Sequence, residues 1–185
     1  FWEFDHNPLV HPMTGVVPFT RLFAYWESWT VALFGRDLAG IRMASTVIGT
    51  LNVVAVWWLA RHLFNRQVAL IAAVLLATFP MHIHFSRVAL NNIVDPLFGT
   101  LALAFLVRGL QSRSRWDFAL AGVCFGLIPY FYEAGRLMFP LMVVGWLVWI
   151  NWIGRRKFDP QTRWSLVAMG IIVVLIAMPV YYNTF

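Results

Sequence analysis

Residues 166–182 read LVAMGIIVVLIAMPVYY and contain no charged side chain. A run of this kind, close to 20 residues long, crosses the hydrocarbon core of a bilayer as a helix, because a helix satisfies its backbone hydrogen bonds internally. Five further apolar runs precede it, at residues 41–63, 68–85, 92–110, 118–132 and 137–153. The sequence therefore predicts about six transmembrane helices.

The composition supports a membrane protein. Of 185 residues, 61% are hydrophobic and 12% charged, and the mean hydropathy is +0.71, whereas a soluble domain carries about twice that share of charge. The prediction is an all-α membrane protein, a polytopic helical bundle forming a single transmembrane domain over residues 1–185. Cys124 lies within an apolar run and is expected to be a buried, inert thiol.

Residues 15–34 differ from the apolar runs. Arg21 and Glu27 stand there among several Phe, Tyr and Trp residues. This mixture favours an amphipathic helix lying in the membrane interface. Residues 1–35 are thus predicted to form an outer loop and an interfacial helix, and residues 41–182 the transmembrane helices.

The basic residues predict the orientation. Connections between consecutive spans alternate sides, which places nine of the 14 Lys and Arg on one side and five on the other. The side with nine is predicted to be cytoplasmic by the positive-inside rule. Topology explains the net charge of +6, so no nucleic-acid partner is expected. Six of eight acids and four of five His fall on the other, outer side.

Three polar clusters are predicted at the outer ends of the helices. Polar and charged groups this close to hydrocarbon are costly and by default mark a site. The clusters are Glu3, Asp5, His6 and His11; then His82, His84, Ser86, Arg87, Asn91, Asn92 and Asp95; then Tyr130, Tyr132, Glu133 and Arg136.

The motifs in these clusters carry a family resemblance. They are HPM at 11–13, FG at 34–35, AGIR at 39–42, HIHFSR at 82–87 and GLIPYFYEAGRL at 126–137. Their order resembles bacterial membrane glycosyltransferases of the protein-mannosyltransferase type, which have the GT-C fold. The resemblance implies transfer of a sugar from a polyprenyl-phosphate donor to a protein or lipid acceptor hydroxyl outside the cytoplasm. It also implies that the chain is an N-proximal fragment of a longer plasma-membrane enzyme.

The resemblance implies a phosphate-binding role for cationic and polar side chains. Arginine suits this role because its guanidinium fork matches phosphate oxygens. Arg87 and Arg136 are the leading candidates, with Arg42 behind them. The other expected substrate-binding residues are His11, His82, His84, Tyr132 and Glu133.

The catalytic base is expected to be a carboxylate. In the family it stands in the first outer loop, upstream of the His-Pro motif, so that Asp5 or Glu3 would have to substitute here. Asp95 resembles the family's second acidic position and is a candidate for binding the acceptor or a divalent cation. No dense carboxylate cluster indicates a metal, so neither a metal nor a resident cofactor is predicted.

Simpler interpretations stay open for several residues. Glu133 and Arg136 are spaced i, i+3 and have the spacing of an ion pair across a helix end. Arg42 is also suited to anchor a helix end by snorkelling, and His82 and His84 to lie in the interface after Pro80 ends a helix. The run at residues 155–157 is interpreted as a topological anchor, with contact to anionic lipid as the alternative.

Two other functional classes stay open. One is a noncatalytic accessory subunit of a larger membrane assembly, with other membrane subunits as partners. The other is a transporter of lipid or solute, which the absence of paired charges within the runs disfavours. The expected partners of the enzyme are membrane lipids, the polyprenyl-linked sugar and the acceptor.

Overall fold

The computed structural model describes residues 10–12, 18–20, 22–131, 134–149 and 159–182. Residues 134–137, residues 181–182 and the two short strands are described by their backbone only. Among the predicted site residues, Glu3, Asp5, Tyr132 and Glu133 lie outside the described residues.

Helices make up nearly all of the described chain, which confirms the predicted fold class. The only other regular elements among these residues are strands β1 (Val10–Pro12) and β2 (Pro18–Thr20), which pair antiparallel with Val10 opposite Thr20. The helices, in chain order, are α1 Leu22–Phe34, α2 Leu38–Leu63, α3 Arg66–Thr78, α4 Pro80–Arg87, α5 Val94–Ser112, α6 Arg115–Leu127, α7 Ala134–Val148 and α8 Pro160–Tyr182, with 3-10 turns η1 Asn91–Ile93 and η2 Ile128–Tyr130.

Three helical segments of the described chain are long and apolar enough to cross a membrane: α2, the continuous segment Asn91–Ser112 and α8. A fourth span results if α3 and α4 are counted together, although they are bent by 59°. The helices α6 and α7, of 13 and 15 residues, are shorter than a bilayer span. The expected total of six spans stays a prediction.

The bend between α3 and α4 corrects the predicted single helix over residues 68–85. Phe79, which precedes Pro80, has extended backbone angles of φ −70° and ψ 120°. A residue before proline is pushed out of the helical region by the proline ring, while proline itself is well suited to begin a helix. The apolar run is therefore divided into two helices, and α4 turns across the neighbouring α2.

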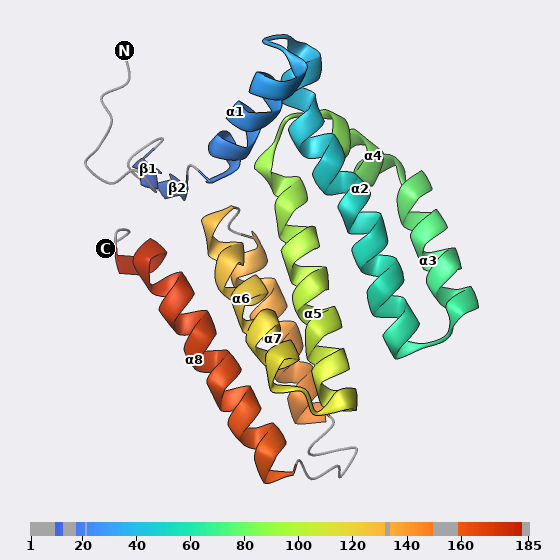
Figure 1. The fold of residues 1–185 in the computed structure, drawn as a ribbon, viewed down its shortest axis with the longest axis vertical. Coiled ribbons are helices and arrows are strands. Elements are labelled where there is room, and N and C mark those ends of the chain that lie inside the picture. Colours follow the sequence, from blue (N-terminus) through green and yellow to red (C-terminus); the bar gives the residue numbers. More distant parts are fainter. Residues whose placement is uncertain (1–9, 13–17, 21, 132–133, 150–158, 183–185) are drawn as a thin grey trace.

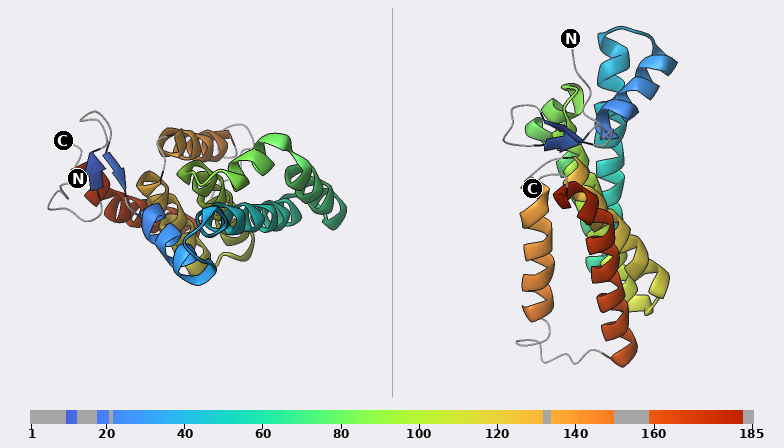
Figure 2. Two further views of the ribbon diagram at one scale, coloured as in Figure 1. Left: turned by 90° about the horizontal axis from the view of Figure 1, so that it is seen from above. Right: turned by 90° about the vertical axis from the view of Figure 1, so that its left-hand side faces the viewer.

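The chain passes back and forth between two ends of the bundle (Figure 1). At one end lie α4 and the beginnings of α2, α5 and α7; we call it the site end. At the other lie the α2–α3 and α5–α6 connections and the beginning of α8; we call it the basic end. Figure 2 shows α7 beside α5 and apart from α8.

Two clusters of buried residues hold the bundle together. Near the site end, Phe23 of α1 packs with Ile48 of α2 and with Val94 and Leu97 of α5. The second cluster joins α5, α6, α7 and α8 and is built around Leu106, Phe118, Ala121, Phe125, Ile128, Val143 and Met169.

Gly122 and Gly126 allow α6 and α8 to approach closely. A Cβ added at Gly122 would lie 2.9 Å from the Met169 carbonyl oxygen, and one at Gly126 would lie 2.7 Å from Ile176 Cβ. Such close backbone approach favours association of helices in lipid. Gly145 and Gly170 make no such approach, since Cβ atoms added there would have no described neighbour within 4 Å.

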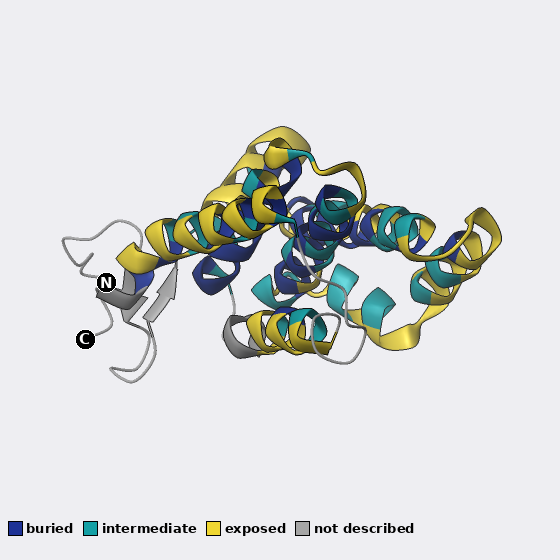
Figure 3. Ribbon diagram, turned by 90° about the horizontal axis from the view of Figure 1, so that it is seen from below, coloured by how far each residue is buried: buried dark blue, intermediate teal, exposed yellow. Residues whose placement is uncertain are grey.

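The outward faces of the helices consist mainly of exposed residues (Figure 3), and many of these residues have large apolar side chains. On α3 they include Leu70, Ile71, Val74 and Leu75, and α8 exposes a similar row. A soluble protein rarely exposes contiguous apolar surface of this extent. The surface is that of a helical membrane protein with its apolar faces toward lipid.

Candidate functional site

The helix α4 carries three of the predicted site residues, and a close contact with α2 positions it. A Cβ added at Gly49 of α2 would lie 2.1 Å from Ser86 Oγ and 2.7 Å from Ser86 Cβ. The Ser86 hydroxyl donates to the His82 carbonyl oxygen at 2.7 Å, and His82 Nε2 lies 3.1 Å from the Gly49 carbonyl oxygen. This contact requires His82 to carry its proton on Nε2, because a carbonyl oxygen accepts but does not donate.

Thr46 joins the same two helices one turn earlier on α2. Its Oγ1 lies 2.9 Å from the Arg42 carbonyl oxygen and 3.1 Å from that of Ser86. The backbone of Arg42 is therefore close to the end of α4, where Arg87 lies. The Arg42 side chain is exposed.

A pocket of about 360 Å³ opens between α2 and α4. Val53, Val54, Ala77 and Ile83 form its apolar part, and we call it the polar pocket because it also has charged and polar side chains. Arg87 and His82 line it together with three hydroxyl side chains, those of Thr46, Thr50 and Ser86. The Arg87 guanidinium can donate hydrogen bonds to an anion, whereas each of the three hydroxyl groups already donates to a backbone carbonyl oxygen. Within the described chain, no carboxylate lies within 4.0 Å of the Arg87 guanidinium. The pocket therefore offers the Arg87 cation to a negatively charged ligand.

An apolar pocket of about 490 Å³ adjoins the polar one. Its walls come from α3, α4, η1, α5 and α7 and consist mainly of Leu76, Phe79, Met81, Phe85, Ile93, Pro96, Met138 and Phe139. His82 lines both pockets. Asp95, only 4% exposed, also lines the apolar pocket, together with Asn92.

The second and third polar clusters of the sequence meet at this end of the bundle. Asn91 Nδ2 donates to the Phe131 carbonyl oxygen at 2.6 Å. The Phe131 ring stacks on that of Phe98 with 5.3 Å between centroids. Arg136 follows Phe131 by a few residues and lies in the first turn of α7. The backbone of Arg136 is therefore near the site, although its side chain is not described.

Helix α7 is held against α5 by another close glycine contact. A Cβ added at Gly99 would lie 2.1 Å from Phe139 Cζ. Because Phe139 and Met138 line the apolar pocket, this contact fixes the wall that α7 contributes.

The remaining predicted residues are placed as follows. His84 is exposed on α4 with its ring centroid 5.6 Å from that of Phe85, and it lines neither pocket. His11 lies in β1, where its backbone pairs with Phe19. The structure thus brings His82, Arg87 and Asp95 together at adjoining pockets and leaves His84 facing outward.

Sequence reasoning missed the two threonines of the polar pocket. Thr46 and Thr50 lie inside the apolar run 41–63, where a threonine hydroxyl is normally satisfied by the helix backbone, as the bond from Thr50 Oγ1 to the Thr46 carbonyl oxygen shows. The signal available was the spacing of Thr46, Gly49 and Thr50, which places small and polar residues on one face of the helix.

Two further polar features flank the site. Glu27 of the interfacial helix α1 is half-buried, and this burial raises the pKa of its carboxyl group. In α2, the Asn52 side chain is buried and donates from Nδ2 to the Ile93 carbonyl oxygen at 2.9 Å. This bond fixes η1, and hence the start of α5, against α2.

Over the described ranges, no group of three or more His, Cys, Asp or Glu side chains has the arrangement of a metal site. The expectation that the protein has no resident metal stays a prediction.

Comparison with known proteins identifies the family. Residues 18–182 match the family described as dolichyl-phosphate-mannose-protein mannosyltransferase. The chain is also 33% identical over 161 residues to the undecaprenyl phosphate-alpha-4-amino-4-deoxy-L-arabinose arabinosyl transferase of Pseudomonas aeruginosa strain LESB58, and 32% identical to that of Pseudomonas paraeruginosa. Each alignment covers 81% of this chain and 27% of the relative, so the chain spans about a quarter of the length of these relatives.

No solved structure matches the chain. The match over residues 18–182 includes all the described helices and both pockets of the site end, and it confirms the predicted resemblance to GT-C glycosyltransferases. The chain belongs to the dolichyl-phosphate-mannose-protein mannosyltransferase family.

Proposed function

We propose that the chain is part of a membrane glycosyltransferase that takes a sugar from a polyprenyl-phosphate donor and transfers it to the hydroxyl group of a protein or lipid acceptor. The observation that carries the proposal is the adjacency of the apolar pocket and the Arg87 pocket at one end of the bundle. Family membership supports it, and so do the relatives, whose name specifies an undecaprenyl-phosphate sugar.

The two pockets suit the two parts of such a donor. The apolar pocket suits the first isoprene units, because Leu, Phe and Met side chains form its walls. The polar pocket suits the phosphate, because the Arg87 guanidinium can donate charge-assisted hydrogen bonds to its oxygens. His82 lines both pockets, a position suited to the junction between lipid and phosphate.

In the proposed reaction, the acceptor oxygen forms a bond to the sugar carbon while the bond from that carbon to the phosphate oxygen breaks. Polyprenyl phosphate leaves, and cationic donors such as Arg87, Arg136 and Arg42 stabilise its developing charge. A carboxylate takes the acceptor proton. Asp5 and Glu3 stay candidates for this base, and Asp95 for a position near the acceptor or for holding a divalent cation.

We place the site end on the extracytoplasmic side of a bacterial plasma membrane. Arg61, Arg66, Arg108, Arg113, Arg115 and Arg163 lie toward the basic end. The positive-inside rule assigns such an excess to the cytoplasm. The acceptor would then be a protein or lipid accessible from outside.

The proposal is tested with Arg87→Ala in the full-length protein. Transfer from a radiolabelled polyprenyl-phosphate sugar is measured in proteoliposomes after insertion and folding have been verified. We expect a loss of about 100-fold or more, because removing one donor to a developing anion has an effect of that order. Arg136→Ala is expected to behave in the same way.

The matched control is Arg36→Ala, since Arg36 is exposed in the α1–α2 connection at the same end and lines neither pocket. The control should retain transfer within about two-fold, as is usual for an exposed charge outside a site. Wild-type transfer by Arg87→Ala would refute the phosphate assignment. A wild-type protein that transfers to neither kind of acceptor would favour the accessory-subunit interpretation.

A further inference from the structure

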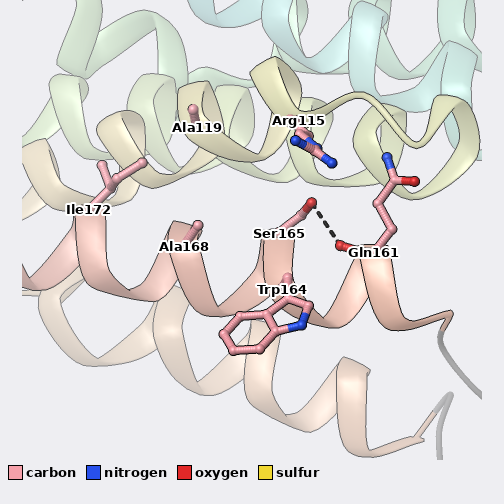
Figure 4. Close-up of a pocket in the computed structure, with 7 residues that line it drawn as sticks. All are labelled: Arg115, Ala119, Gln161, Trp164, Ser165, Ala168 and Ile172. Atoms are coloured by element: carbon pink, nitrogen blue, oxygen red, sulfur yellow. Dashed lines mark hydrogen bonds between the residues drawn. The ribbon is translucent and has the colours of Figure 1, made fainter.

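A third pocket lies at the basic end, between the first turns of α6 and α8, and has a volume of about 340 Å³. Figure 4 shows its side chains in two groups. Arg115 of α6 and Gln161 and Ser165 of α8 lie together at one end of the pocket, and Ala119, Ala168 and Ile172 continue along both helices. The pocket therefore has a polar end and an apolar continuation.

The charges around the polar end leave an excess of arginine. Asp117 is paired with Arg108, and Asp159 lies 3.9 Å from Arg113. Arg115 and Arg163 are both exposed and have no carboxylate within 4.0 Å in the described part of the chain. An anion at this position would thus meet cations that are not already neutralised.

The helix geometry adds to this preference. Both α6 and α8 begin here, at Arg115 and Pro160, and the N-terminal end of a helix carries partial positive charge. The Gln161 amide can donate a further hydrogen bond, whereas the Ser165 hydroxyl already donates to the Gln161 carbonyl oxygen at 3.0 Å (Figure 4).

Two tryptophans fix the depth of this pocket in the membrane. Trp116 is 81% exposed and Trp164 75% exposed, next to the two unpaired arginines in sequence. Exposed tryptophan side chains favour the headgroup level of the bilayer. The polar end of the pocket is therefore at headgroup depth, and its apolar continuation runs toward the hydrocarbon.

We propose that this pocket binds one anionic phospholipid. Its phosphodiester lies against Arg115 and Gln161, and one acyl chain follows the channel formed by Ala119, Ala168 and Ile172. The apolar continuation favours a lipid over a free phosphate ion, which would use the polar end alone. This site is at the opposite end of the bundle from the glycosyl-transfer site and does not depend on the proposed function.

Binding is measured by native mass spectrometry on the full-length protein in detergent, titrated with phosphatidylglycerol. Arg115→Gln should weaken the tightest binding event by about ten-fold or more, because a hydrogen bond to a charged group is lost. Ala168→Phe keeps every charge but fills the apolar channel, and it should weaken the same event. Both variants should have the unfolding temperature of the wild type.

Three controls separate the sources of binding. Arg66→Gln removes an exposed cation at the same end but outside the pocket and should bind as the wild type does. Phosphatidylcholine should bind at least ten-fold more weakly than phosphatidylglycerol, and inorganic phosphate should not compete at lipid-equivalent concentrations. Equal binding of the two lipids, full competition by phosphate, or unchanged binding in both pocket variants would overturn the proposal.

Discussion

The contact between α2 and α4 leads to a sharp prediction for Gly49→Ala. A Cβ at this position would lie 2.1 Å from Ser86 Oγ, 2.7 Å from Ser86 Cβ and 3.6 Å from Ser86 Cα. Rotation of the serine side chain moves Oγ away but leaves Cβ where it is. To bring that pair to an ordinary contact of 3.4 Å, α4 must withdraw from α2 by about 0.7 Å.

This withdrawal has two consequences. Overpacking of a close helix contact costs about 1–3 kcal/mol of the free energy of unfolding. The shift also lengthens the His82–Gly49 hydrogen bond of 3.1 Å and moves Arg87, which belongs to the same short helix. A displacement near 1 Å of a group that contacts substrate lowers the rate by about 100-fold. Gly49→Ala should therefore lose both stability and transfer.

A double-mutant cycle identifies the cause. Ser86→Gly removes the side chain that an alanine at position 49 would meet, which leaves only the 3.6 Å contact with the Cα of residue 86. The pair Gly49→Ala and Ser86→Gly should be less destabilised than the sum of the single variants, by about 1 kcal/mol or more. Unfolding is followed by thermal denaturation in detergent, and transfer in proteoliposomes. Wild-type stability in Gly49→Ala, or strict additivity in the cycle, would refute the steric argument.

Three further predictions concern other helix contacts. Gly126→Ala should lower the free energy of unfolding by about 1–3 kcal/mol, because its Cβ would meet Ile176 at 2.7 Å. Gly170→Ala, whose Cβ would have no neighbour within 4 Å among the described residues, should be neutral or slightly stabilising in the same thermal denaturation assay. Tyr130→Phe should cost about 1 kcal/mol by loss of the 2.8 Å bond to the Ile176 carbonyl oxygen, measured by chemical denaturation. Arg108 holds the pKa of Asp117 below its usual value of 3.8. The ion pair therefore stabilises the fold above that pH, and this stabilisation is lost as the pH falls through the lower pKa of the folded state. Asp117→Asn should be less stable than the wild type at pH 7, and the difference in the free energy of unfolding should shrink below about pH 4 in a pH series.

The helical membrane fold was predictable because its cause is local. Apolar runs near bilayer length have no other stable form in lipid, whatever their neighbours are. The break at Pro80 was also visible as a local signal, but its geometry was not. With the 59° bend, Ser86 of α4 lies against Gly49 of α2, and those residues are far apart in the sequence.

The polar pocket contains residues that the sequence predicted and others that it did not. Arg87 and His82 were predicted because a cation and an imidazole stand out beside apolar runs. Thr46 and Thr50 did not stand out, because a hydroxyl inside a helix is usually satisfied by the backbone four residues earlier. Only the tertiary contact between Thr46 and the Ser86 carbonyl oxygen reveals that this face of α2 borders the site.

Among the described side chains, some arginines of the bundle are paired with a carboxylate and others are not, and the arginines at the site end belong to the second group. At the basic end, the buried carboxylate of Asp117 is paired with Arg108, accepts from Ser112 at 3.2 Å and holds the α5–α6 connection together. At the site end, neither Arg42 nor Arg87 has a described carboxylate within 4.0 Å. A guanidinium already neutralised by a protein carboxylate would attract a phosphate weakly, whereas an unneutralised one beside an apolar pocket attracts it strongly. Asp117 and Arg108 thus stabilise the α5–α6 connection, whereas Arg87 has no described carboxylate partner and is available to the phosphate of a lipid-linked sugar.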